Sequence, residues 1–141
     1  MSAKTFVDTN VLIYAHDTDA RRKHEIASGL LRQLWSDRTG ALSPQVLQEF
    51  YVNVTRKIAS PLSKPSARAV VDSYFAWCVD TTPAEISAAF RIEDEAGIGF
   101  WDALILAAAR KAGADRLLTE DLNSGQIIAG VRIEDPFSQS V

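Results

Sequence analysis

The stretch that decides the fold of this chain is KTFVDTNVLIY, which occupies residues 4–14. Near its start, Thr5 to Val7 have the β-branched and aromatic composition of a short buried strand. Asp8 follows where that strand should end, and Asn10 is a good N-cap for a helix over residues 11–16. Open α/β sheets bind ligands where a strand ends and a helix begins. Asp8 is therefore predicted to bind a metal ion, with a turn or capping role as the simpler alternative.

The composition of the chain is that of one soluble globular domain. The chain has 141 residues, of which 47% are hydrophobic and 23% are charged, and this length fits a single domain over residues 1–141. The formal net charge of −3 argues against a large, purely electrostatic surface for nucleic acid. It does not exclude an enzyme that acts on nucleic acid, because bound metal ions supply local positive charge.

Cysteine, histidine and hydropathy patterns exclude several other classes. Cys78 is the only cysteine, so neither an internal disulfide nor a cysteine-based zinc site is expected. His16 and His24 do not have the spacing of a metal site. No apolar stretch approaches the roughly 20 residues of a membrane span, and Asp8 and Asn10 interrupt the apolar region that a signal peptide would need. A cytoplasmic protein without a membrane segment is expected.

Predicted strands alternate with predicted helices along the chain. Apolar residues at helical spacing predict helices over residues 20–36, 44–59, 66–77, 84–96 and 100–113. Short strands are predicted over residues 4–8, 41–43, 114–119 and 131–133, with a further possible strand at 78–80. This alternation predicts an α/β fold, with a central, mostly parallel sheet of four to five strands and helices on both faces. Ile86 and Phe90 are predicted to face the core, as are Trp35, Trp77 and Trp101.

Four acids occupy comparable positions in this scheme. Asp8 and Asp121 each follow a strand, Asp102 lies in the first turn of a helix, and Glu49 lies near the start of another. In a parallel α/β sheet these strand ends and helix starts share one edge, so the four carboxylates are predicted to converge. Oxygen ligands without histidine or cysteine suit Mg²⁺ or Mn²⁺. The alternatives are dipole complementation for Asp102, solvation for Glu49 and a turn for Asp121.

Other polar residues are candidates for supporting roles. Asn10, Ser43 and Thr119 lie beside the acids and could hydrogen-bond their outer oxygens, although Asn10 and Ser43 could also act only as N-caps. A basic group at the start of a predicted helix opposes the helix dipole and is a candidate RNA contact, with a merely solvated cluster as the alternative. This basic group comprises Arg21, Arg22 and Lys23, and Arg56 is a further candidate for contacting a phosphate.

Four segments in this order resemble PIN-domain ribonucleases, specifically toxins of the VapC type from bacterial toxin–antitoxin pairs. The matching segments are VDTNVLIY at 7–14, SPQVLQEF at 43–50, FWDALI at 100–105 and LLTEDLNSGQ at 117–126. Each segment is a weak motif by itself, whereas the four together, spread over nearly the whole chain, make a specific match.

The resemblance implies a PIN-like three-layer α/β/α domain that cleaves RNA endonucleolytically with Mg²⁺, for which Mn²⁺ can substitute. It implies that Asp8, Glu49, Asp102 and Asp121 match the acidic metal-binding positions of the family, although Glu120 adjoins Asp121 and could replace it. It also implies a homodimer that is silenced by a cognate antitoxin, whose tail occupies the active-site groove.

Two other functions remain open at this point. A phosphatase of the haloacid dehalogenase type would use Asp8 as a nucleophile, but commonly has a second aspartate where this chain has Asn10. A phospho-receiver or other non-catalytic binding module would need an acid pair after the first strand, where only Asp8 is present, and Asp80 would be its nominal phosphate acceptor.

Overall fold

A computed structural model describes residues 3–138 of the chain and contains a five-stranded sheet with six α-helices. The strands are β1 (Lys4–Val7), β2 (Gly40–Ala41), β3 (Ala114–Leu118), β4 (Ile127–Ile128) and β5 (Val131–Glu134). The α-helices are α1 (Thr9–His16), α2 (Arg22–Asp37), α3 (Pro44–Arg56), α4 (Lys64–Tyr74), α5 (Pro83–Ala96) and α6 (Phe100–Lys111). Two short 3₁₀ turns, η1 (Thr18–Ala20) and η2 (Phe75–Trp77), complete the described part. Residues 3–138 include no helix that could span a membrane.

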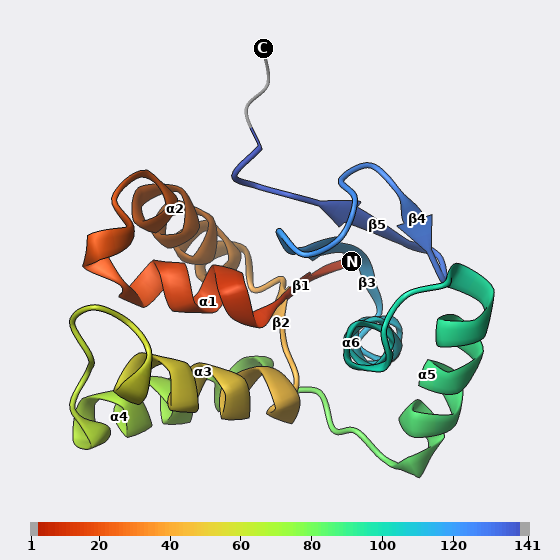
Figure 1. The fold of residues 1–141 in the computed structure, drawn as a ribbon, viewed down its shortest axis with the longest axis horizontal. Helices are drawn as coiled ribbons and strands as arrows, with labels where there is room; N and C mark the ends of the chain where they lie inside the picture. The colour runs from red at the N-terminus through yellow and green to blue at the C-terminus, as the bar shows by residue number, and fades with distance from the viewer. Residues whose placement is uncertain (1–2, 139–141) are drawn as a thin grey trace.

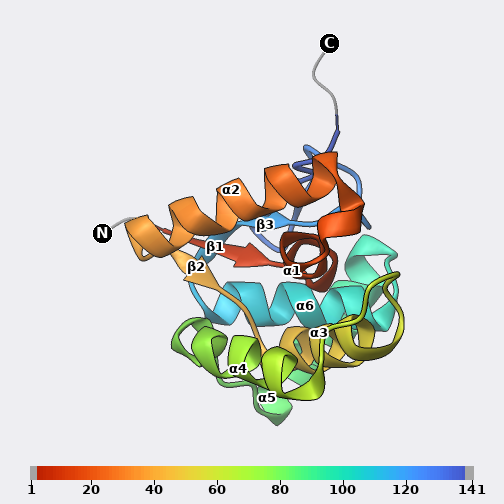
Figure 2. The same ribbon diagram turned by 90° about the vertical axis from the view of Figure 1, so that its left-hand side faces the viewer.

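The sheet has the strand order β2-β1-β3-β5-β4, and only β4 runs antiparallel to its neighbour. Helix α2 lies on one side of the strands and α6 on the other (Figure 2), which is the three-layer α/β/α arrangement. Helices α3 and α4 lie together at one end of the molecule, and α5 packs beside α6 at the other (Figure 1). The predicted fold class, with a mostly parallel central sheet, is confirmed.

The core is built where the strand patterns predict it. Phe6 and Val7 of β1 and Leu117 of β3 are completely buried, as expected for strands covered on both faces. The two strands pair in parallel with Val7 opposite Leu118. This register brings the residues that follow each strand, Asp8 and Thr119, to the same edge of the sheet.

Several predicted boundaries were wrong because tertiary contacts set them. The helix predicted at 66–77 ends at Tyr74 and continues only as the 3₁₀ turn η2, and the possible strand at 78–80 is reduced to one parallel bridge between Cys78 and Leu42. Strand β4 was not predicted, because two residues carry no readable pattern. It exists because Ala129 and Gly130, both with positive φ, turn the chain back onto β5.

Buried and exposed aromatic residues also differ from the prediction. Trp77 is buried, and its ring fills the space where Gly40 would carry a Cβ atom, only 2.6 Å away. Trp35, at 39% exposure, packs beside Trp77, whereas Trp101 is 66% exposed. Ile86 and Phe90 on α5 are exposed as well, so their predicted core positions were wrong. Helix α5 buries Ala89 and Ile92 instead, because α6 covers that face of the helix.

Candidate functional site

Asp8 is a nearly buried carboxylate at the edge where β1 meets α1. Its Oδ1 accepts a hydrogen bond from the backbone N–H of Thr9 at 2.7 Å, and its Oδ2 accepts one from the hydroxyl of Thr119 at 2.8 Å. Asp8 is therefore the N-cap of α1, and the predicted capping role of Asn10 was wrong because the helix begins at Thr9. Burial raises the pKa of Asp8 to about 7, against the lowering effect of these two hydrogen bonds.

Asp102 and Asp121 bring their carboxylates to Asp8 from two other elements. Asp102 lies in the first turn of α6, and Asp121 lies in the loop between β3 and β4. One oxygen from each of Asp8, Asp102 and Asp121 lies within 4.8 Å of the other two. Burial, with the charge of Asp121 as a smaller contribution, raises the pKa of Asp102 above its usual range. The three carboxylates therefore repel one another in a way that a divalent cation would relieve.

Asn10 and Thr119 hold the third carboxylate in place. The side-chain amide of Asn10 donates to Asp121 Oδ2 at 3.0 Å, and the Thr119 hydroxyl accepts from the Asp121 backbone N–H at 3.1 Å. Because Thr119 also donates to Asp8, one hydroxyl connects two of the acids. The predicted supporting positions of Asn10 and Thr119 therefore correspond to direct contacts with the acids.

Glu49 lies at the border of this group. It is exposed on α3, and its Oε1 accepts a hydrogen bond from the Thr9 hydroxyl at 3.2 Å. Among the described residues it is not part of the group whose oxygens lie within 4.8 Å of one another. Thr9 thus links two of the acids, because its backbone N–H donates to Asp8 and its hydroxyl donates to Glu49. This role of Thr9 was not predicted from the sequence.

Glu120, the alternative fourth acid, forms its contacts away from the three clustered carboxylates. Its two oxygens accept hydrogen bonds from the Tyr14 hydroxyl, at 2.5 Å, and from Lys23, at 2.8 Å. Burial raises the pKa of Glu120, but Lys23 and Tyr14 together outweigh it and hold that pKa below its usual range. Of the two adjacent acids, Asp121 is the one that faces Asp8 and Asp102.

Comparison with known protein families finds one match, which spans most of the chain. The sequence profile of the PIN domain family matches residues 5–127, which includes all four acids. The chain belongs to the PIN domain family. No curated protein is detectably similar to it in sequence.

Solved structures of VapBC and VapC proteins have the same fold as this chain. A chain of VapBC2 from Rickettsia felis, bound to a promoter DNA fragment, is 20% identical with a TM-score of 0.64, covering 92% of this PIN domain chain and 96% of that chain. A chain of DNA-bound VapBC from Salmonella typhimurium is 22% identical with a TM-score of 0.65, covering 96% and 99%. VapC20 from Mycobacterium tuberculosis, a toxin that cleaves the sarcin-ricin loop, is 19% identical with a TM-score of 0.64, covering 92% and 99%.

The basic residues predicted to contact RNA have different surroundings in this PIN domain. Lys23 is paired with Glu120, and Arg22 donates to the backbone carbonyl of Phe137 at 3.2 Å. Arg21 is exposed with a positive φ of 54°, and Arg56 is exposed at the end of α3. Lys23 and Arg22 therefore serve contacts within the chain, which the sequence could not show because their partners lie about a hundred residues away.

Ser43 does not make the predicted contact with an acid. It occupies the N-cap position of α3, but its side chain forms no capping hydrogen bond. Its hydroxyl is buried and has no hydrogen-bond partner among residues 3–138. Ser43 therefore does not support the carboxylates through the direct hydrogen bond that had been predicted.

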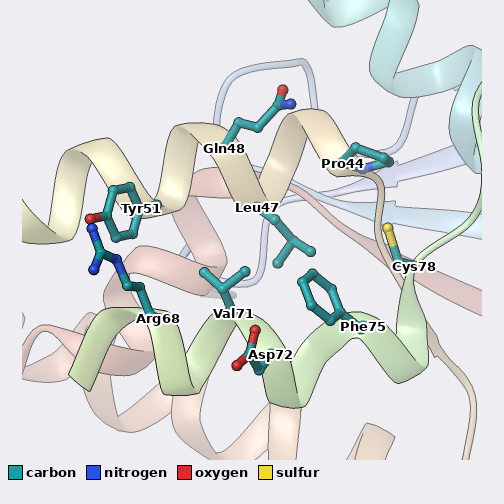
Figure 3. A pocket seen from close by; sticks show the side chains of 9 residues that line it. All are labelled: Pro44, Leu47, Gln48, Tyr51, Arg68, Val71, Asp72, Phe75 and Cys78. Atoms are coloured by element: carbon teal, nitrogen blue, oxygen red, sulfur yellow. The ribbon is translucent and has the colours of Figure 1, made fainter. Parts of the chain in front are cut away.

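An apolar groove between α3 and α4 is separate from the acidic group (Figure 3). It encloses about 360 Å³. Leu47 from α3 and Val71 from α4 face each other in it, while Arg68 lies against the ring of Tyr51 at 5.8 Å from the ring centre. None of the four acids lines this groove, so the chemistry of this PIN domain is not expected there.

Proposed function

We propose that this PIN domain is a metal-dependent endoribonuclease that acts as the toxin of a toxin–antitoxin pair. The observation that carries the proposal is the convergence of Asp8, Asp102 and Asp121 from three separate elements. A cluster of like charges at the edge of a parallel sheet is unfavourable unless it binds a cation. Membership of the PIN domain family and the shared fold of the VapC structures support the nuclease chemistry.

The donor set suits a hard divalent ion. Asp8, Asp102 and Asp121 would hold it directly, and Glu49 would act at its border. All four donors are carboxylate oxygens, which favours Mg²⁺, with Mn²⁺ as a substitute, over zinc. The bound ion would supply positive charge and Lewis acidity for hydrolysis of an RNA phosphodiester bond.

The residues of the chain orient this site. The Thr9 backbone N–H and the Thr119 hydroxyl direct both oxygens of Asp8, while Asn10 directs Asp121. Asn10 occupies the position where a haloacid dehalogenase commonly has its second aspartate, and its amide is committed to Asp121. Asp80, the nominal acceptor of a phospho-receiver, lies outside the group of three acids. These contacts favour hydrolysis at a carboxylate-bound metal over both alternatives.

Cleavage of an end-labelled RNA pool by the purified chain tests the proposal. We expect cleavage with Mg²⁺ or Mn²⁺, none with EDTA, and products that carry a 5′-phosphate and a 3′-hydroxyl, because water is the attacking group. Attack by the ribose 2′-hydroxyl would leave a cyclic phosphate instead. Cleavage that persists in EDTA, or products with cyclic phosphate ends, would contradict the proposed chemistry.

We also propose two protein partners, a second copy of the chain and a cognate antitoxin. The exposed rings of Phe90 and Trp101, which flank the half-buried ring of Phe100, leave apolar surface that a second copy would bury. Two solved structures with this fold are of VapBC proteins bound to DNA. Light scattering of the purified chain should give twice its 15.5 kDa mass, and replacing Phe90 and Trp101 by serine should give the monomer mass. An unchanged mass in that variant would place the dimer contact elsewhere.

Of the four basic residues that the sequence singled out, we propose RNA contacts for two. Because Lys23 and Arg22 are committed to partners within the chain, Arg21 and Arg56 are the better candidates for phosphate contacts. The proposal for localisation is cytoplasmic, as the sequence predicts.

A further inference from the structure

The loop that carries Asp121 has no regular structure to hold it. Asp121 is exposed between β3 and β4, whereas Asp8 follows a buried strand and Asp102 lies within a helix. A carboxylate on an exposed loop loses the geometry that a metal ion needs unless neighbouring side chains fix the loop. Asn10 provides one such contact, at 3.0 Å from the carboxylate itself.

A second set of contacts holds the residue immediately before Asp121. The Tyr14 hydroxyl and Lys23 bind the two oxygens of Glu120 at 2.5 and 2.8 Å, and the Asn10 side-chain carbonyl accepts from the Glu120 backbone N–H at 3.4 Å. Asn10 and Tyr14 are four residues apart on α1, so they lie on one face of the helix. This face therefore contacts two consecutive residues of the loop.

The side chain of Lys23, which contacts Glu120, is itself restrained by two aromatic residues. Its ammonium lies 3.4 Å from the Tyr14 hydroxyl, 4.9 Å from the centre of the Tyr14 ring and 5.6 Å from that of Phe137. The two aromatic rings meet edge to face at 5.1 Å. The cation thus has a defined position between α1, α2 and the C-terminal segment, which a lysine that merely extends into solvent does not have.

From these contacts we propose that Tyr14, Lys23 and Glu120 form a positioning latch, which fixes the loop so that Asp121 faces Asp8 and Asp102. The latch touches neither RNA nor metal and acts through Asp121. The inference rests on the proposed metal site, and it assigns to Lys23 and Glu120 a role different from RNA contact or metal binding.

The test is Mn²⁺ binding by the intact protein, measured by isothermal titration calorimetry, together with amide hydrogen exchange of residues 120–126. We expect Lys23→Met and Glu120→Ala each to weaken Mn²⁺ binding about tenfold, the low end for residues that orient a metal ligand. Both variants should also speed exchange of the loop amides. Lys23→Arg should restore binding to within about twofold, and the double variant should lose no more than either single one, because both break the same contact.

The ion pair between Lys111 and Glu85 provides a matched control. It is a similarly partly exposed pair, at 3.2 Å, that joins α6 to α5 away from the acids. Lys111→Met should leave Mn²⁺ binding and loop exchange unchanged. An equal loss in Lys111→Met, or wild-type binding and loop exchange in Lys23→Met, would overturn the latch.

Failure of the latch is distinguishable from failure of the proposed function. If the wild-type chain binds Mn²⁺ but cleaves no RNA, the ribonuclease proposal fails while the calorimetric comparison still tests the latch. If the wild-type chain binds no Mn²⁺, the metal site fails, and loop exchange in Lys23→Met alone decides whether the loop depends on this contact. Weaker RNA binding by Lys23→Met with unchanged Mn²⁺ binding would make Lys23 an RNA contact and overturn the latch.

Discussion

Asp102→Asn is expected to lower the rate of RNA cleavage at saturating Mg²⁺ by about a thousandfold or more. The substitution removes one of the three carboxylates that meet within 4.8 Å, and with it a charge that would hold the divalent ion. Loss of a group that stabilises charge in the transition state typically costs a factor of about 10²–10³, and loss of a metal ligand adds to that. The measurement is single-turnover cleavage of an end-labelled RNA.

Two further variants make this loss interpretable. Asp94→Asn replaces an exposed aspartate on α5 and should keep the wild-type rate, which controls for the preparation and for net charge. Glu49→Gln should lose only about 10- to 100-fold, the range for a residue that orients metal ligands, because Glu49 lies at the border of the group. Equal cleavage by wild type, Asp94→Asn and Asp102→Asn would identify a contaminating nuclease and remove support for the proposed site.

Asp8→Asn is expected to stabilise the metal-free fold while it abolishes activity. The folded state raises the pKa of Asp8 from 3.8 to about 7, so between these values the folded carboxyl keeps a proton that the unfolded one has lost. Raising the pH through this range therefore lowers the stability of the folded state, and this loss of stability is complete above about pH 7. The shift corresponds to a few kcal/mol of folding free energy. Asparagine carries no charge and ranks with aspartate as an N-cap, so the variant avoids this loss.

The measurement is the thermal unfolding midpoint in EDTA from pH 4 to pH 8. At pH 8 the midpoint of Asp8→Asn should lie roughly 5–15 °C above that of the wild type, and the two should converge near pH 4. Adding Mn²⁺ at pH 8 should raise the wild-type midpoint and leave the variant nearly unchanged, because a ligand stabilises only the state that binds it. Parallel pH profiles for the two proteins would show that burial does not penalise the charge of Asp8.

The sequence by itself determined the fold class and the positions of the acids along it. A buried strand ending in Asp8, followed at once by a helix, specifies a strand-to-helix junction, because the strand composition and the capping residue are both local signals. The same holds for α6, whose alanine, leucine and isoleucine content predicts a helix with Asp102 in its first turn. Parallel strands end at one edge, so the convergence of these two acids followed from the fold class alone.

Only the tertiary structure decided which of two adjacent acids completes the group. Glu120 and Asp121 are equivalent in any local pattern, since both lie in a loop without periodicity. Their directions are set by Asn10, Tyr14 and Lys23, which come from helices about a hundred residues earlier in the chain. The predicted burial of Trp101 was wrong for a similar reason, because its burial depends on which face of α6 meets α5 and the sheet. Long-range packing sets the directions of side chains in loops and on crowded helices, and local sequence patterns carry no information about that packing.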